Sequence, residues 1–431
     1  MSELLERVVE LRAQADYEGA RKEALAGLKA PSFDLLIELG RLQHDLGEED
    51  EAEATFERAA EVADGDPQRS RACARLVGVY RDQGRARDAE AKAREGLALA
   101  GSEDSLERAD VLVALADAQR DIGEYAEAAE GYGRALPMAE SAPPSLERDR
   151  VTIRARAGVG NVHRAQGRYD EAEPVLREVI AAAEEAFGPD SLETAEALND
   201  LGIVFKYCGR FDEAEPLYRR ALAINERAVG EEHYNVASLY HNLGGLEHAR
   251  GNYEQAEPHA RRSVEIRRSL YGRDHRATAS DEAALASILY ALRKDEEAEE
   301  LLRDALPVYE RVFGEDHYEV SVHLNNLAAI LQRRGADDEA EALYRRSLAM
   351  KEKLVGSEHP VIANTLNNLA VICRRQERFE EAERLYKRAL EVLEAGVEPG
   401  HPTLATTRRN YEALLRAMGP TGRKKEADRP V

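Results

Sequence analysis

The chain of 431 residues contains no tryptophan, 7 phenylalanines and 3 cysteines. Cys73, Cys208 and Cys373 are odd in number and far apart, so the sequence offers no disulfide framework. Each falls in an expected helix, where we predict a small buried apolar residue. The composition is dominated by Ala, Leu, Glu and Arg, which favours helices over sheets.

Long apolar runs are also missing. No run approaches the roughly 20 residues that cross a bilayer as a helix. The first residues, MSELLERVVELR, lack the basic segment and apolar core of a signal peptide. We therefore expect a soluble, cytoplasmic protein that does not contact a membrane.

Basic residues are fewer than acidic residues. The chain has 60 Lys and Arg but 83 Asp and Glu, which gives a net charge of −23. Phosphate backbones and anionic lipid surfaces attract clustered Lys and Arg, so this balance disfavours a nucleic acid or a membrane as partner. It remains compatible with a local basic patch.

Enzyme signatures are absent as well. The sequence has no phosphate-binding glycine loop, no His-Glu-x-x-His, no Gly-x-Ser-x-Gly and no Cys-x-x-Cys. The many carboxylates recur once per repeat, so choosing two of them as catalytic acid and base would be arbitrary. We expect no catalysis, no cofactor and no metal.

The dominant feature of the sequence is a period of 42 residues. The period is marked by Gly188, Gly230, Gly272, Gly314 and Gly356, and by Leu201, Leu243, Leu285, Leu327 and Leu369. A fixed period of this length indicates one small supersecondary unit stacked many times. Because such a unit cannot bury its own apolar face, its neighbours must cover it.

Each unit reads as a helix, a turn and a second helix. In residues 359–400, apolar residues recur at three- and four-residue steps in two stretches, as helical faces require. The turn of an earlier unit contains Gly167, which can adopt the left-handed conformation that ends a helix. After it, Asp170 and Glu173 have the spacing of a capping box for the second helix.

The predicted fold is therefore all-α, with about ten helix pairs. Residues 1–148 hold shorter, irregular pairs, residues 149–400 hold six 42-residue units, residues 401–418 form a lone capping helix, and residues 419–431 form a disordered tail. The unit at 275–316 is degenerate, because Arg293 replaces the turn glycine and Pro307 falls in mid-helix. Proline kinks or ends a helix, so we predict an irregularity there.

The repeat resembles a known family. The signature of the tetratricopeptide repeat is matched by Leu201, Gly202, Phe205, Gly209, Phe211, Ala214, Tyr218 and Ala221. The 42-residue unit, with its Asn-Asn-Leu-Ala segments at 325–328 and 367–370, resembles the repeats of kinesin light chains and their bacterial relatives. The resemblance covers residues 149–416 strongly and the first 148 more weakly. It implies a right-handed superhelical solenoid whose first helices line a concave groove for peptides or partner proteins.

On the face that this resemblance turns toward the groove, cations and amides recur. The last position of that face reads Arg81, Arg120, Arg164, Lys206, His248, Tyr290, Gln332 and Arg374. The candidate groove residues are Asn161, Arg164, Asn199, Lys206, His241, His248, Asn325, Arg333, Asn367, Arg374 and Arg375. Arg can clamp carboxylates and Asn can bond a peptide backbone, so we predict an acidic partner segment or a free C-terminal carboxylate.

Two structural interpretations of the same residues stay open. The cations lie at the ends of first helices, where they would complement the helix dipole. The asparagines could bond between repeats.

A histidine also recurs with the repeat, at His233, His275, His317, His359 and His401. Neighbouring helices pack roughly 10 Å apart, whereas a zinc–nitrogen bond is about 2 Å. Equivalent histidines therefore cannot share an ion, and we predict that they cap or pack the start of each first helix.

The leading functional hypothesis is a non-catalytic scaffold that holds an extended partner segment in its groove. One alternative is a peptide-sensing regulatory receptor, or the sensor subunit of a bacterial signalling or defence system. Another is a self-assembling structural protein, which light scattering at several concentrations would distinguish.

Overall fold

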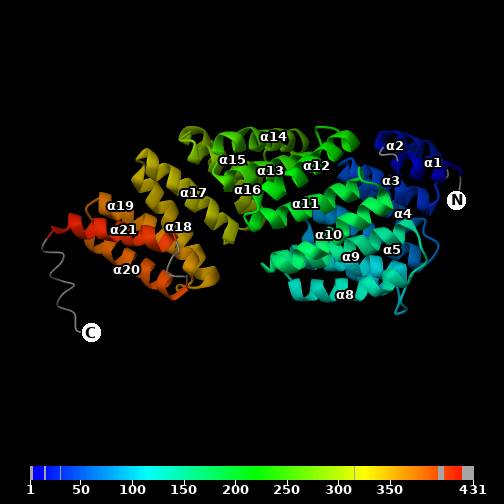
Figure 1. Ribbon diagram of the computed structural model, residues 1–431, viewed down its shortest axis with the longest axis horizontal. Helices are drawn as coiled ribbons and strands as arrows, with labels where there is room; N and C mark the ends of the chain where they lie inside the picture. The colour runs from blue at the N-terminus through cyan, green and yellow to red at the C-terminus, as the bar shows by residue number, and fades with distance from the viewer. Residues whose placement is uncertain (1–2, 14–15, 30, 315, 397–401, 420–431) are drawn as a thin grey trace. The chain divides into compact units, whose positions relative to one another are not determined.

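The computed structural model describes residues 3–13, 16–29, 31–314, 316–396 and 402–419, and every regular element in these ranges is a helix (Figure 1). The shorter repeats comprise α1 (Glu3–Ala13), α2 (Tyr17–Ala26), η1 (Gly27–Lys29), α3 (Phe33–Asp45), α4 (Glu49–Glu61), α5 (Asp66–Asp82), α6 (Ala86–Leu99), α7 (Leu106–Asp121) and α8 (Tyr125–Ser141). The 42-residue repeats comprise α9 (Leu146–Ala165), α10 (Tyr169–Phe187), α11 (Leu192–Tyr207), α12 (Phe211–Val229), α13 (Tyr234–Arg250), α14 (Tyr253–Tyr271), α15 (Arg276–Ala291), α16 (Asp295–Phe313), α17 (Tyr318–Arg334), α18 (Asp337–Val355), η2 (Pro360–Ile362), α19 (Ala363–Arg375) and α20 (Phe379–Gly396). A single helix, α21 (Pro402–Ala417), follows.

The all-α repeat fold is thus confirmed. Twenty of the α-helices follow one another as ten first and second helices, and α21 stands at the predicted capping position. The predicted disordered tail, apart from Gly419, lies outside the described residues.

Contacts divide the chain into two compact units, Met1–Arg250 (unit 1) and Gly251–Val431 (unit 2). The division falls in the turn between α13 and α14. The predicted boundary at residue 148 separates two kinds of repeat, and this division does not test it.

Packing within a unit follows from the repeated small and large residues. In unit 1, Tyr218 of α12 is fully buried against Gly202 of α11, where an added Cβ would lie 2.7 Å from the tyrosine ring. Tyr344 and Tyr386 fill the same position in unit 2, and both are fully buried. Each second helix also packs on the following first helix, so every repeat covers the apolar face of its neighbour.

The turn inside each repeat requires a left-handed residue. Gly167, Gly209, Gly251 and Gly335 occupy this position with φ between 73° and 85°. Their counterparts Arg293 and Glu377 have φ of 63° and 59°, and they are the non-glycine residues with positive φ in the described chain. A side chain in this conformation costs about 1 kcal/mol relative to glycine.

We therefore expect Arg293→Gly to stabilise helices α15 and α16 by about 1 kcal/mol. Hydrogen exchange of peptides from these helices at increasing urea concentration measures the change. Gly335→Arg, at the same position one repeat later, is the matched reversal and should lose a similar amount. Equal protection from hydrogen exchange in Arg293→Gly and in the parent would show that the backbone at Arg293 is not strained.

Two expectations about local structure were wrong, and a third is contradicted in part. Asp170 does not cap α10, because the helix already begins at Tyr169 and Asp170 lies in its first turn. Pro307 does not end α16, which continues to Phe313, and the irregularity predicted for this repeat stays a prediction. Cys208 is exposed, because it follows the last residue of α11, whereas Cys73 and Cys373 are buried as predicted.

The histidine prediction holds for four of five positions. The Nδ1 atoms of His233, His275, His317 and His359 each accept a hydrogen bond from the backbone N–H two residues later, at 3.2 to 3.3 Å. His401 lies outside the described residues.

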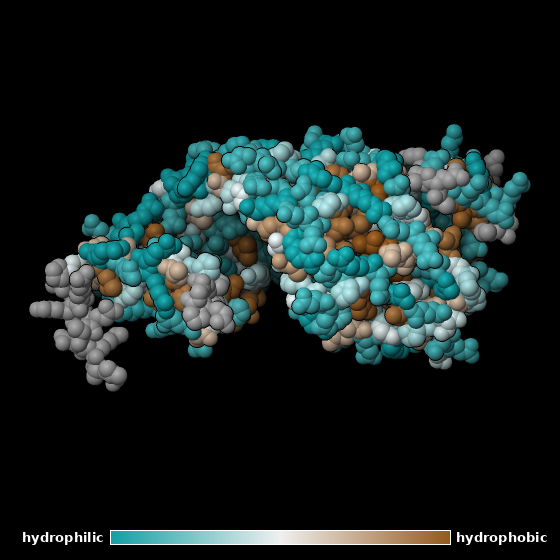
Figure 2. Space-filling model, viewed as in Figure 1, coloured by the Kyte–Doolittle hydropathy of each residue, from teal (hydrophilic) through white to brown (hydrophobic). Residues whose placement is uncertain are grey.

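Hydrophilic residues cover most of the face shown in Figure 2, in keeping with the high content of charged residues. None of the helices in the described ranges carries an apolar window that would satisfy a bilayer crossing.

Candidate functional site

The candidate site is a cavity of about 610 Å³ inside unit 1. First helices from α1 to α13 supply most of its lining, and Asn161, Arg164 and Asn199 of the predicted set belong to it. These helices line the cavity because successive first helices touch one another, as in α3–α5, α5–α7 and α7–α9. Within unit 1 the first helices therefore face inward.

Charged groups of both signs line the cavity. The arginines are Arg12, Arg41, Arg75, Arg81, Arg120, Arg150, Arg154 and Arg164. The carboxylates are Asp45, Asp82, Asp117, Asp121, Glu193, Glu196 and Asp200. The sequence analysis followed a single row of cations and missed these acids, so it predicted a more basic surface than the fold assembles.

Asp117 shows how the network is balanced. Arg154 donates to Asp117 at 3.0 Å, and the guanidinium groups of Arg81 and Arg120 lie 3.6 Å from its oxygens. Burial alone would raise the pKa of Asp117, but the three cations outweigh it and lower the pKa to about 2. Arg81 and Arg120, which belong to the predicted cation row, are thus committed to the fold.

Arg164 and Lys206 differ from the other predicted cations of unit 1. Among the described residues neither is in an ion pair, although Arg164 Nε donates to Asn161 Oδ1 at 3.1 Å. They occupy equivalent positions one repeat apart, in the last turns of α9 and α11. Burial and then the nearby Arg164 lower the pKa of Lys206. The nearby Asp200 carboxylate interacts electrostatically with Arg164 but accepts its hydrogen bond from Asn161. Because neither cation is in an ion pair in the part of the chain that the structure describes, the two like charges are suited to an anion.

An exposed aromatic surface adjoins this pair. Lys206 Nζ lies 5.4 Å from the centroid of the Tyr207 ring, and the Tyr207 ring stacks on Tyr169 at 6.2 Å. Tyr207 is 60% exposed, the largest fraction among the exposed large apolar and aromatic residues. A ligand anchored on the cations could therefore also contact an aromatic face.

The predicted asparagines bond between neighbouring helices. In unit 1, Asn161 Nδ2 donates to Asp200 at 2.7 Å, and Asn199 accepts from Asn242 at 2.8 Å. In unit 2, Asn325 accepts from Thr365 at 2.9 Å, and Asn367 accepts from Asn410 at 2.9 Å. This geometry favours the alternative that the asparagines join repeats.

The remaining predicted residues occupy three settings. His241 and His248 lie half-buried on α13, and burial lowers the pKa of His248. In unit 2, Arg333 pairs with Asp295 and stacks 3.5 Å from the centroid of Tyr290. Arg375 pairs with Asp337 at 3.2 Å.

Arg374 completes the predicted set. It has no ion pair in the described chain, and its buried Nε has no hydrogen-bond partner. Arg374 therefore shares with Arg164 and Lys206 the absence of a carboxylate partner.

Sequence reasoning missed one residue that lines the cavity without a partner in the described chain. Glu196 of α11 makes no hydrogen bond or ion pair within the described residues. Burial within the unit, and then the Asp200 carboxylate, raise the pKa of Glu196 to about 7 although the side chain is accessible from the cavity. Its position one helical turn before Asp200 was the available signal.

A second missed row comes from the second helices. Asn225 of unit 1 lines the cavity, and its counterparts in unit 2 are Arg267, Tyr309 and Lys351, spaced by 42 residues. Lys351 Nζ donates to Thr365 Oγ1 at 3.1 Å, and the Tyr309 ring lies 3.8 Å from His323. The sequence held a clue to this row: these repeats carry a polar residue at a position of the second helix where other repeats carry the apolar Ala183 or Leu393.

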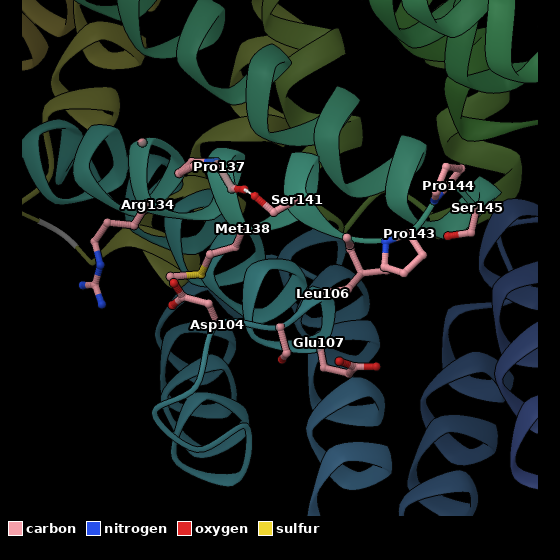
Figure 3. Close-up of a pocket in the computed structure, with 13 residues that line it drawn as sticks. Asp104, Leu106, Glu107, Arg134, Pro137, Met138, Ser141, Pro143, Pro144 and Ser145 are labelled. Carbon is pink, nitrogen blue, oxygen red and sulfur yellow. Dashed lines mark hydrogen bonds between the residues drawn. The ribbon is translucent and has the colours of Figure 1, made fainter.

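Two further clusters were considered as sites. Glu341, Cys373 and Glu381 bring potential metal ligands within 4.8 Å of one another, but Arg345 and Arg378 already pair with both carboxylates. A pocket of about 920 Å³ lies between the loops that precede α7 and α9 and the end of α8 (Figure 3). Its Arg134 pairs with Glu130 of the same helix, so neither cluster offers an unpaired cation.

Comparison with protein families matches tetratricopeptide repeats over residues 152–227, 197–269, 235–311, 277–353 and 361–421, and again over residues 33–66. These segments cover more than half of the chain. The chain belongs to the tetratricopeptide repeat family. Proteins of this family generally act as scaffolds for protein interactions and not as catalysts.

Solved structures similar to this tetratricopeptide repeat protein include kinesin light chain-like proteins. BtubC (BKLC) from P. vanneervenii is 23% identical with a TM-score of 0.44, and the match covers 60% of this chain and 96% of that one. A Podosopora anserina kinesin light chain with nearly identical TPR-like repeats is 22% identical with a TM-score of 0.41, over 46% and 93% of the two chains. No curated protein matches the chain significantly.

Proposed function

We propose that this tetratricopeptide repeat protein is a non-catalytic cytoplasmic scaffold that holds an acidic segment of a partner protein at Arg164, which lines the cavity of unit 1, and at the neighbouring Lys206. The observation that carries the proposal is the pair Arg164 and Lys206, which has no ion-pair partner in the described chain. Burial and then the charge of Arg164 lower the pKa of Lys206, and an incoming carboxylate would offset the second of these effects. Arg164 can bind it with two parallel hydrogen bonds.

Other arginines of the cavity are already paired with carboxylates of the fold, so they are poor anchors for a ligand. Arg41, Arg75 and Arg154 already pair with Glu147, Asp110 and Asp117. Replacing these internal partners with a ligand carboxylate would leave a charge of the fold unpaired, at a cost of several kcal/mol. The ligand therefore meets available positive charge at Arg164 and Lys206.

The test is a binding titration with defined acidic peptides. Fluorescent decapeptides rich in Asp and Glu, prepared with a free or an amidated C-terminus, are titrated into the whole chain at fixed salt. We expect Arg164→Glu/Lys206→Glu to weaken binding by about tenfold or more, since two charge-assisted contacts become repulsive. A loss that also follows amidation identifies the C-terminal carboxylate as the anchored group.

The control variant is Arg94→Glu/Arg219→Glu, which makes the same change in net charge. These arginines lie on the outer surfaces of α6 and α12, with side chains 61% and 57% exposed. Equal loss of binding in the control and the test variant would show that net charge, and not the site, drives binding. Unchanged binding in the test variant, with circular dichroism intact, would refute the proposal.

A peptide-sensing receptor is the second candidate, and it is favoured because the helices of several repeats, from α1 to α13, line one cavity. A receptor should change its conformation when the peptide binds, whereas a scaffold need not. Hydrogen exchange of unit 1 with and without peptide separates the two: changed protection in helices that do not touch the peptide indicates a receptor.

A further inference from the structure

The two ends of unit 1 meet across its cavity. Leu192 at the start of α11 and Ala228 near the end of α12 are partly buried and pack against the apolar core of α1, α2 and α3. Figure 1 likewise shows these N-terminal helices next to α11 and α12. At the same junction a Cβ on Gly47 would lie 3.5 Å from the Tyr234 ring. The first helix pairs thus contact residues that follow them by about 180 positions.

An ion pair also joins α3 to α9, the helix that begins the 42-residue repeats of unit 1. Arg41 of α3 donates to both oxygens of Glu147 on α9, at 2.9 and 3.0 Å, across 106 residues of chain. Glu147 also pairs with Arg75 at 2.6 Å and with Arg150 at 3.2 Å. Burial would raise the pKa of Glu147, but the arginines hold it well below its usual value. Glu147 is therefore ionised and tied to α3 at neutral pH.

This junction differs from the packing of consecutive repeats. Consecutive helices pack closely along their lengths, whereas α3 meets α9 through long side chains. The helices α1 and α2 have 11 and 10 residues, against 16 to 20 in α9 to α12. Isolated helices of about ten residues are marginal in water, so α1 and α2 depend on their shared apolar core with α3, which the junction adjoins.

We propose that α1, α2 and α3 form a clasp that closes the cavity of unit 1 and swings away to admit an occupant. The clasp is held by Arg41 and Glu147, together with the contacts of Leu192 and Ala228. Closed, it places α1 and α3 in the wall of the cavity. Open, it exposes the inner faces of α9 and α11. Opening of the clasp would admit any occupant to the cavity, whether or not it is an acidic peptide.

The absence of tryptophan from the chain allows a direct test. Phe187→Trp places a single tryptophan in the cavity wall, and quenching of its fluorescence by neutral acrylamide reports access from solvent. Arg41→Gln cuts the clasp but leaves every carboxylate with a cation, because Glu38 keeps Arg12 and Glu147 keeps Arg75. We expect the quenching constant to rise about threefold or more.

A second variant protects the test against misfolding. Glu147→Gln cuts the clasp from the other side, and Arg41, Arg75 and Arg150 each keep a carboxylate in Glu38, Asp110 and Glu193. The control is Arg81→Gln, which removes a cation of the same cavity that pairs with Asp117 and Asp121 of the adjacent α7. The control should leave quenching unchanged.

The results discriminate without a ligand. Increased quenching in both clasp variants, with circular dichroism preserved and the control unchanged, supports the clasp. Equal quenching in the clasp variants and the parent, or an equal rise in the control, would overturn it. The peptide titration tests the proposed function separately. A negative result for the clasp therefore leaves the proposed binding of an anion at Arg164 and Lys206 to be tested by that titration.

Discussion

Lys351→Met is expected to stabilise unit 2 by about 2 kcal/mol at pH 7. Lys351 is 5% exposed, and within the described residues its ammonium contacts a hydroxyl and no carboxylate. Burial lowers the pKa of Lys351 to about 8, which corresponds to a penalty of about 3 kcal/mol on its charged form. Met has a similar length but no charge, so it avoids this penalty. The substitution also removes the hydrogen bond to Thr365, which reduces the gain in stability by about 1 kcal/mol.

The pH dependence gives this prediction a second signature. The folded-state pKa of Lys351 is lowered, so the unfolded chain binds more protons between about pH 8 and 10.5. The stability of the parent should rise through this window, and the advantage of Lys351→Met should shrink. Hydrogen exchange of α17, α18 and α19 peptides in urea measures both, since repeats can unfold separately.

Lys353→Met is the matched control, because this neighbour on α18 is 64% exposed and pairs with Asp316 at the surface. The control should change stability by less than about 0.5 kcal/mol. Lower exchange protection in Lys351→Met than in the parent would contradict the prediction, because it would mean that the buried ammonium stabilises the fold.

Acidification from pH 7 to pH 5 is expected to destabilise unit 2 by about 2 kcal/mol through His323 alone. His323 is 4% exposed, its Nδ1 has no hydrogen-bond partner, and its ring lies against Tyr309. Burial lowers the pKa of His323 to about 4. The unfolded histidine titrates near 6.5, so this contribution to stability is present above pH 6.5 and is lost as the pH falls toward 4.

His323→Gln isolates the contribution, because glutamine retains a polar side chain but does not titrate in this range. The difference in exchange protection between the parent and His323→Gln, followed in α16 and α17 from pH 7 to 5, should change by about 2 kcal/mol. His359→Gln is the control, since this histidine caps η2 from an exposed position. A parallel pH response in the parent and His323→Gln would contradict the assignment.

The repeat itself was predictable because its rules are local. A glycine at 167, 209, 251 and 335 marks the left-handed turn, and the structure shows positive φ at each. The histidine before each described first helix bonds a backbone N–H two residues away, which also requires nearby residues alone. Spacing along the chain is sufficient for such contacts, so helix pairing and the position of α21 followed from the sequence.

The candidate site was predictable in part. The sequence identified the inward face of the first helices in unit 1, and Asn161, Arg164 and Asn199 line the cavity. It did not identify which cations are already paired. Arg164 and Arg333 look alike in the sequence, yet Arg333 meets Asp295 of the preceding repeat and Arg164 meets an asparagine.

The amino-acid order alone was enough to establish a stack of helix pairs, because a 42-residue period repeats the same local turn and apolar spacing. The charge pattern of the cavity and the contact between distant repeats of unit 1 came from the folded arrangement. Arg41 and Glu147 are 106 residues apart, and their contact depends on the accumulated rotation of several repeats. No local pattern records that rotation, so the partners of a buried charge are set by the fold as a whole.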